Sequence, residues 1–259
     1  MKPDPADIPS MEQVADGFFV RQAIDNIGWV DMGGFAVVVD ALEQRELEEE
    51  VFRAIGETIG DVPVRYVFNT HTHYDHVALN GAFKRRLGSE IINRRTCKIP
   101  PEGRWYKGQR RRALLLPMPG CHTKDDCVVW VPEDRALFVG DIFGWGLISL
   151  TGHLNEKTER LLLETHQKLI DLGPAVVIPG HGPLCSVNEL ERWVKYFCWL
   201  RDEVARAVDT GLTDKEIKHT LAPPEDMKCW WRLVQWKHED SVARVIKAVR
   251  GGWAARQGA

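Results

Sequence analysis

The sequence lacks three features, each of which would by itself indicate a class of protein. No apolar run approaches the roughly 20 residues that a membrane-spanning helix needs. No segment repeats at a fixed period and no tract has low complexity, which argues against solenoid, collagen-like and disordered proteins. The six cysteines contain no C-x-x-C pair, so the commonest redox and zinc-binding cysteine motifs are missing.

The first ten residues, MKPDPADIPS, also lack the apolar stretch of a secretory signal. Without an export signal, the cysteines are most simply reduced thiols, several of them filling the core. We therefore expect a soluble, cytoplasmic protein. Its 259 residues, 44% hydrophobic and 27% charged, suffice for a single globular α/β domain that spans the chain.

The net charge of −3 predicts no partner, but its distribution is uneven. Between Lys84 and Arg112 there are eleven basic residues against two acidic ones. This basic segment could steer an anionic small-molecule substrate, such as a carboxylate, a coenzyme A thioester or a phosphodiester. The favoured alternative is a solvated face that balances the acidic helix between Glu43 and Glu57. Aromatic residues are few in the segment, so nucleic acid is an unlikely partner.

Short apolar runs separated by turn residues predict an antiparallel meander at 17–21, 27–32 and 35–40. Further strands are predicted at 64–68, 90–93, 114–116, 127–131, 135–140 and 175–178, and a basic loop at 105–112. Helical spacing predicts helices at 42–59, 77–87 and 157–172, and three or four more after residue 187. This order fits two packed mixed sheets with helices outside, and it argues against a purely parallel, doubly wound fold.

The segment NTHTHYDH, residues 69–76, holds three of the nine histidines. It follows the predicted strand 64–68, and ligands usually bind at the carboxyl ends of such strands. In an extended segment His71 and His73 point the same way and can grip one metal ion, while Asp75 and His76 could serve a second.

Three other residues follow buried strands at glycine-flanked turns, where ligands are expected. His122 lies in PGCHTKDD, Asp141 ends ALFVGD, and His181 follows AVVIPG. They are the candidates that would complete a metal site. An ordinary turn role is the alternative for each of them.

The string H-x-H-x-D-H, followed in order by these three segments, resembles the metallo-β-lactamase-fold hydrolases over residues 14–200. The resemblance implies a four-layer αββα sandwich with a helical C-terminal extension over residues 201–259. It also implies two zinc ions, with iron or manganese as alternatives, and Asp141 bridging them. On this pattern one ion is held by His71, His73 and His122, and the other by Asp75, His76 and His181.

A hydroxide shared by two such ions has a lowered pKa and is the expected nucleophile. We therefore expect a hydrolase of ester-like bonds, with Asp75 and Asp141 as catalytic residues. Thioesters, lactones and other esters fit best; phosphodiesters are an alternative, and β-lactams are at most incidental substrates. No G-x-S-x-G motif offers a serine nucleophile instead.

Comparison with subfamilies narrows the chemistry without assigning a substrate. A carboxylate stands at the position of His73 in the diiron flavoproteins, and lactonases of the fold carry a tyrosine where Gly144 stands. The glutathione-binding Arg and Lys pattern of hydroxyacylglutathione hydrolases is not recognisable in the C-terminal helices. The RNA-binding arm of the transfer RNA phosphodiesterases is also missing.

Other residues carry weaker expectations. Trp145 is expected on a loop that borders the substrate pocket, and Cys121 is expected to pack rather than to bind zinc. His153 is expected at the surface. The tryptophans of the C-terminal helices are expected to pack in a core or an interface: Trp193, Trp199, Trp230, Trp231 and Trp236.

Two alternatives to zinc hydrolysis remain open at this stage. One is a persulfide dioxygenase, which resembles this fold and uses a single iron on the equivalents of His71, His122 and Asp141. The other is a non-enzymatic, metal-stabilised scaffold whose basic surface binds a partner. The oligomeric state is not indicated by the sequence.

Overall fold

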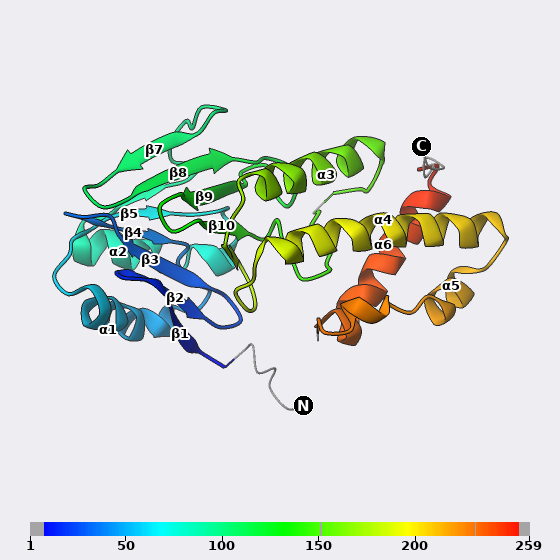
Figure 1. Ribbon diagram of the computed structural model, residues 1–259, viewed down its shortest axis with the longest axis horizontal. Helices are drawn as coiled ribbons and strands as arrows, with labels where there is room; N and C mark the ends of the chain where they lie inside the picture. Colours follow the sequence, from blue (N-terminus) through cyan, green and yellow to red (C-terminus); the bar gives the residue numbers. More distant parts are fainter. Residues whose placement is uncertain (1–7, 151, 231, 254–259) are drawn as a thin grey trace. The chain divides into compact units, whose positions relative to one another are not determined.

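The computed structural model describes residues 8–150, 152–230 and 232–253, and they divide into two compact units (Figure 1). Unit 1 comprises the described residues up to Pro119, then Thr123–Ile142 and Gly173–Val187. Unit 2 comprises Gly120–His122, Phe143–Leu172 and the chain from Asn188. No helix among the described residues is both long and apolar enough to cross a membrane. The expectation of a single domain stays a prediction.

The first sheet of unit 1 has six strands, and their order in the sheet is their order in the sequence. Neighbours from β1 to β4 are antiparallel, which confirms the meander, and β4, β5 and β6 are parallel. Strand β1 was not predicted because none of its residues is buried and they show no apolar pattern. The strands are β1 (Ser10–Ala15), β2 (Phe18–Gln22), β3 (Ile27–Asp31), β4 (Ala36–Val39), β5 (Val64–Phe68) and β6 (Glu90–Ile92).

The second sheet has five strands in the order β11-β10-β9-β8-β7, and only β10 and β11 are parallel. The basic loop predicted at 105–112 is wrong, because Arg104–Lys107 form a strand in which Trp105 lies opposite Leu114. Alternation explains this strand, since Tyr106 packs into the core while its neighbours face outward. The strands are β7 (Arg104–Lys107), β8 (Arg112–Pro117), β9 (Cys127–Val131), β10 (Ala136–Gly140) and β11 (Val176–Pro179).

A single apolar core joins the inner faces of the two sheets. The rings of Phe18 and Phe138, one from each sheet, stack with centroids 5.8 Å apart. Two helices, α1 (Glu48–Ile59) and α2 (Asn80–Leu87), cover the outer face of the first sheet. Helix α1 is shorter than predicted, because Leu42 adopts a φ of +55° that no right-handed helix contains.

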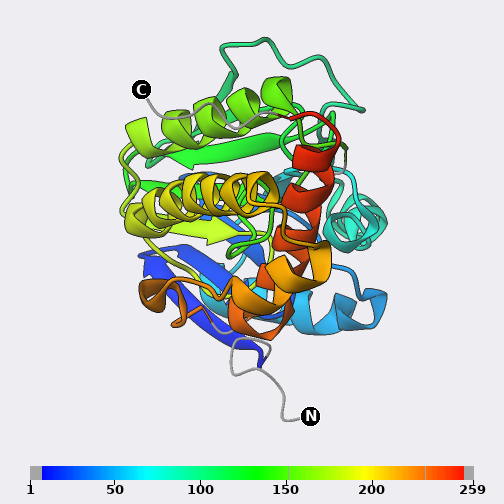
Figure 2. The ribbon, with the colours of Figure 1, turned by 90° about the vertical axis from the view of Figure 1, so that its right-hand side faces the viewer.

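Unit 2 contains four α-helices among its described residues, and α6 runs across α4 (Figure 2). The Tyr196 hydroxyl of α4 lies 2.8 Å from His238 Nδ1 at the start of α6. A π-helical turn, Leu233–Lys237, leads directly into α6. The helices are α3 (Glu156–Asp171), α4 (Val187–Asp209), α5 (Asp214–Thr220) and α6 (His238–Arg250).

The tryptophans of these helices follow the packing prediction only in part. Trp193 and Trp230 are buried, as expected. Trp236 is 48% exposed and does not pack in the core, because Leu233 and Lys237 of the π-helical turn are buried instead; its packing in an interface stays a prediction. Trp231 lies outside the described residues. Two mixed sheets flanked by helices confirm the predicted α/β class.

Candidate metal centre

The histidine cluster leaves the carboxyl end of β5, where the sequence predicted it. The chain turns through a short 3-10 segment, Tyr74–His76, before α2 begins. Buried Asn69 holds this turn, because its side-chain amide donates to the His76 carbonyl at 3.0 Å and to Asn80 Oδ1 at 3.1 Å. The backbone between strand and helix is therefore fixed by one buried amide.

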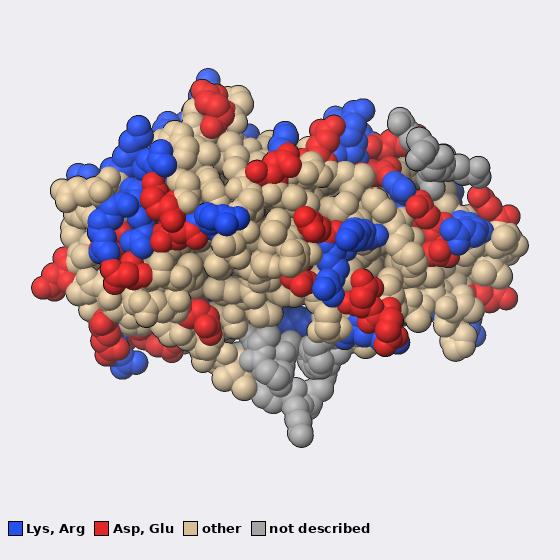
Figure 3. Space-filling view, in the orientation of Figure 1, with Lys and Arg blue, Asp and Glu red and all other residues tan. Residues whose placement is uncertain are grey.

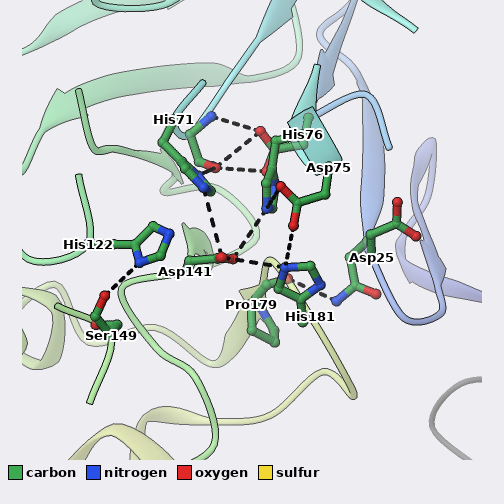
Figure 4. A network of polar contacts seen from close by, with 12 residues as sticks. Asp25, His71, Asp75, His76, His122, Asp141, Ser149, Pro179 and His181 are labelled. Carbon is green, nitrogen blue, oxygen red and sulfur yellow. Dashed lines mark hydrogen bonds and ion pairs between the residues drawn. The ribbon is translucent and has the colours of Figure 1, made fainter. Parts of the chain in front are cut away.

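Four ligand atoms of unit 1 converge at one point (Figure 4). Asp75, His76, Asp141 and His181 each offer one atom, and these atoms lie within 4.8 Å of one another. His181 Nε2 is 3.3 Å from Asp75 Oδ2 and 3.4 Å from Asp141 Oδ2. His76 Nε2 is 3.3 Å from Asp141 Oδ1.

A second convergence shares the same carboxylate. The ligand atoms of His71, His73 and Asp141 also lie within 4.8 Å of one another, and His71 Nε2 is 3.8 Å from Asp141 Oδ2. Asp141 follows β10 directly and faces both groups. One carboxylate between two sets of imidazoles is the arrangement expected for a bridging ligand.

Gly180, in the segment PGHG, is required by this geometry. A Cβ atom at Gly180 would lie 2.1 Å from Asp141 Oδ1 and 2.7 Å from His76 Cε1. Buried Asn26 fixes the same segment, since its side-chain amide donates to the carbonyls of Pro179 and Gly182. The loop is thereby held against the carboxylate with no room for a side chain.

Hydrogen bonds at Nδ1 set the orientation of the imidazoles in unit 1. His76 Nδ1 donates to Asp40 Oδ2 at 3.0 Å, and His181 Nδ1 donates to the Ile24 carbonyl at 2.7 Å. His71 Nδ1 lies 3.2 Å from the Thr70 hydroxyl. In His76 and His181 these bonds leave the Nε2 lone pair directed at the cluster, which is how metal-binding histidines are usually held.

Asp40, which is 4% exposed, was not predicted from the sequence to be part of the site. Besides His76, it accepts hydrogen bonds from the backbone amide and the hydroxyl of Thr70. A signal existed, because Asp40 ends the apolar strand VVVD just as Asp141 ends FVGD. Asn26 and Asn69 carried no such signal, since buried asparagines look like turn residues in a sequence.

His122 lies in unit 2, in the turn that follows β8. Its Nδ1 donates to the Ser149 carbonyl at 2.6 Å, which leaves Nε2 as the candidate ligand atom. The bond is of the same kind as those of His76 and His181. The assignment of His122 to a metal ion stays a prediction.

The ionisable groups of the cluster hold one another in their charged forms. Burial alone would raise the pKa of Asp75, but the hydrogen bond from His181 and the charge of His76 lower it to about 2. Burial alone would lower the pKa of His181, but the carboxylates of Asp141 and Asp75 raise it to about 10. A metal ion must replace these imidazole protons, so its uptake would release them.

The donors fit a metal ion on a further observation. Asp75 Oδ1 is buried, and no residue among those described donates a hydrogen bond to it. Buried polar atoms are normally satisfied, because leaving one without a partner costs about 1–3 kcal/mol. Imidazole nitrogens and carboxylate oxygens are the ligands that zinc accepts. The cluster therefore has the chemistry of a metal centre.

The structure also describes Cys121, His153 and Trp145, for which the sequence analysis made further predictions. Cys121 is fully buried, and neither group of ligand atoms found among the described residues contains a cysteine, which agrees with packing. His153 is exposed, as expected. Trp145 packs against Phe143 and Trp230 of unit 2, with ring centroids 5.2 and 5.5 Å away. Its part in a substrate pocket stays a prediction.

The basic segment is largely neutralised by ion pairs within unit 1. Arg86 pairs with Glu49 of α1 at 2.6 Å, and Arg85 pairs with Glu48, which agrees with the favoured balancing role. Figure 3 shows basic and acidic side chains intermixed on the face that it presents. Further pairs of the segment are Arg86–Glu48, Arg95–Asp125, Arg110–Asp16, Arg110–Asp31, Arg111–Asp134 and Arg112–Glu133.

The paired His/Asp clusters on this fold fit a metal-binding protein, and sequence comparison shows its family. The sequence model of the Metallo-beta-lactamase superfamily matches residues 23–181. The chain belongs to this superfamily. It is 33% identical over 126 residues to a hydroxyacylglutathione hydrolase of Brucella anthropi, covering 45% of this chain and 46% of the relative. The homologous enzyme of Brucella abortus is 30% identical over 126 residues, covering 45% and 47%.

The chain thus spans about half the length of the relatives it matches. Among solved structures, a metallo-beta-lactamase from Pontibacter korlensis is 18% identical with a TM-score of 0.60, covering 72% of this chain and 97% of that one. A stereoselective inverting sec-alkylsulfatase from Pseudomonas sp. is 13% identical with a TM-score of 0.74, covering 98% and 52%. At these identities the two structures support the fold alone.

Proposed function

We propose that the protein is a dinuclear zinc hydrolase that cleaves an ester-like bond, with thioesters as the first substrates to test. The observation that carries this proposal is the single carboxylate of Asp141, shared by two convergent sets of ligand atoms. The resemblance of the motifs assigns His122 to the ion of His71 and His73. The similarity to hydroxyacylglutathione hydrolases favours a thioester over other esters.

Bound zinc would supply Lewis acidity, polarising the substrate carbonyl and making water reactive near neutral pH. The chain itself holds the ligands ready. Asp40 and the Ile24 carbonyl keep the Nδ1 protons of His76 and His181, so their Nε2 atoms stay available as ligands. Asp75 and Asp141 are the carboxylates we assign to catalysis. Interactions with His181 and His76 lower the pKa of Asp75 to about 2, so its carboxylate is ionised at neutral pH and available as a ligand.

The substrate we propose is a small molecule, and the basic segment gives little reason to expect an anionic one. Its arginines are engaged with carboxylates of the same unit, so the field that they project into solvent is reduced. Nucleic acid is disfavoured for the same reason. Trp145 remains the residue that we propose for the apolar wall of the pocket.

A reconstitution experiment tests this function. The chain is stripped with a chelator, reloaded separately with zinc, manganese and iron, and assayed on a panel of thioesters, lactones, phosphodiesters and β-lactams. We expect thioester hydrolysis that reaches its maximum at two zinc ions per chain. Asp141→Asn should retain the fold but lose at least about 100-fold in rate, because the shared ligand is weakened.

The same preparation separates the alternatives. Oxygen uptake with glutathione persulfide and one tightly held iron would replace the hydrolase with a persulfide dioxygenase. Failure to hydrolyse any member of the panel, together with salt-sensitive binding of nucleic acid, would favour the scaffold alternative.

A further inference from the structure

The loop between Asp141 and α3 is held by side chains from the far end of the chain. Within unit 2, the carbonyl of Gly144 accepts a hydrogen bond from Lys237 Nζ at 2.6 Å. The carbonyl of Gly146 accepts one from the Ser241 hydroxyl at 3.0 Å. Backbone carbonyls buried in a loop need such partners, because no helix or sheet supplies them. Lys237 and Ser241 supply two of them from the π-helical turn and α6.

Two more donors from the same helices continue this pattern. The carbonyl of Leu147 accepts a hydrogen bond from Trp193 Nε1 of α4 at 3.2 Å. The carbonyl of Leu150 accepts one from the Arg244 guanidinium of α6. Residues 144–150, which we call the clamped loop, are thus bound at four carbonyls by α4, the π-helical turn and α6.

The clamped loop adopts a conformation that it would not hold by itself. Trp145 has a φ of +53°, in the region that side-chain-bearing residues rarely occupy. At Gly146, φ is +90° and an added Cβ atom would lie 2.3 Å from Leu233 Cδ1 of the π-helical turn. A residue with a side chain, such as Trp145, is strained in this region, and the conformation persists only where surrounding contacts impose it.

The Ser149 carbonyl is the fifth in this loop with a hydrogen-bond donor, and it links the clamped loop to a candidate metal ligand. The Ser149 carbonyl accepts the Nδ1 proton of His122 at 2.6 Å, between the carbonyls that Trp193 and Arg244 hold. The position of this carbonyl therefore sets the orientation of the His122 ring. Buried Lys237, only 4% exposed, anchors the end of the loop nearest to Asp141.

We propose that the C-terminal helices position the metal centre, with Lys237 and Ser241 as positioning residues that act through the clamped loop and Ser149 on His122. This inference rests on the proposed function, because it takes His122 as a zinc ligand. It gives the helices beyond residue 200 a role in metal binding, although they contain none of the seven proposed ligands.

Cobalt substitution tests the proposal by a readout other than activity. The absorption spectrum of bound Co²⁺ depends on its ligands and their geometry, and zinc affinity is measured separately by competition with a chromophoric chelator. Lys237→Met keeps the aliphatic stem without the donor, and Ser241→Ala removes one hydroxyl. For both variants we expect an altered cobalt spectrum and a loss of about tenfold or more in the affinity of one of the two zinc ions.

Ile217→Ala is the matched control, because it opens a cavity at a buried residue of α5, the helix that supplies none of the four donors to the clamped loop. It should unfold at a lower temperature but keep the wild-type cobalt spectrum and both zinc affinities. Wild-type spectra and affinities in Lys237→Met and Ser241→Ala would overturn the proposal and leave the proposed function intact. A wild-type chain that takes up no cobalt or zinc would overturn both.

Discussion

Asp40 accepts a hydrogen bond from His76 Nδ1 and thereby determines how this proposed ligand is oriented. Outer carboxylates of this kind fix the ring and raise the basicity of the nitrogen that binds the metal. We predict that Asp40→Asn lowers zinc affinity by about 10- to 100-fold with little change in the far-ultraviolet circular dichroism. Chelator competition on the purified variant measures this.

Asp31→Asn is the control for this substitution. Asp31 also ends a strand of the first sheet, but its carboxylate pairs with Arg110 instead of a histidine. It should bind zinc as the wild type does. Equal zinc affinities in all three proteins would mean that Asp40 has only a structural role.

Gly180 offers a steric test of the shared carboxylate. In Gly180→Ala the new methyl group would occupy space taken by Asp141 Oδ1 and His76, so we predict the loss of at least one zinc ion per chain. Gly56→Ala is the control, because nothing lies within 4 Å of its Cβ position in α1 and alanine favours a helix by about 1 kcal/mol. Elemental analysis of both variants decides the matter. Full zinc content in Gly180→Ala would contradict the geometry.

At the scale of single residues, the proposed ligands have recognisable sequence patterns, and the residues that orient them do not. His71, His73, Asp75 and His76 share one short segment, and Asp141 and His181 each follow a recognisable buried strand. Asp40 and Asn26 act across the fold on partners 36 and more than 150 residues away, respectively. No local pattern shows such contacts, because they exist only after the sheets have assembled.

His166 gives a pH prediction for helix α3. The ring is fully buried, stacks on Trp193 with centroids 3.9 Å apart, and donates from Nδ1 to the Leu162 carbonyl. Burial lowers the pKa of His166 from 6.5 to about 4. Between these values the unfolded chain binds a proton that the folded chain does not, so the free energy of unfolding falls as pH decreases.

We expect this histidine to cost about 2 kcal/mol of stability between about pH 7.5 and pH 5, since each pKa unit corresponds to about 1.4 kcal/mol. His166→Phe keeps a ring on Trp193 and removes the titration. Urea unfolding of both proteins at the two pH values measures the difference, in which other titrating groups cancel. If the two proteins lose the same stability on acidification, His166 is protonated in the folded state.

Elements were predictable where a periodic pattern was complete, and less so at their ends. Strand β5 has the predicted bounds because its apolar residues are bounded by a turn and by the histidines. Helix α1 lost its first residues to the left-handed backbone at Leu42, which periodicity does not register. Strand β7 was missed because its arginine and its lysine masked the one inward aromatic, Tyr106.

For the whole molecule, metal binding should contribute to stability. A ligand that binds only the folded state at 100 times its Kd adds about 2.7 kcal/mol for each site. For a chain of this size we predict that chelation lowers the unfolding temperature by roughly 5 to 10 °C. Differential scanning calorimetry before and after chelation, with zinc added back, measures this shift. Identical transitions in all three samples would argue against resident metal.

The charge distribution can also be understood only from the whole molecule. The excess of basic residues between Lys84 and Arg112 looked like a binding surface in the sequence, where partners are invisible. In the fold most of these arginines pair with carboxylates of α1, of β3 or of loops such as the turn between β9 and β10. Local charge counts overestimate a surface potential whenever tertiary ion pairs form between distant segments.

The central claim is that two zinc ions flank Asp141, and a crystal structure with anomalous scattering at the zinc edge tests it most directly. The account predicts two zinc peaks, one bound by Asp75, His76 and His181 and the other by His71, His73 and His122, with the Asp141 carboxylate between them. A single iron peak, or no anomalous peak after soaking in zinc, would contradict it.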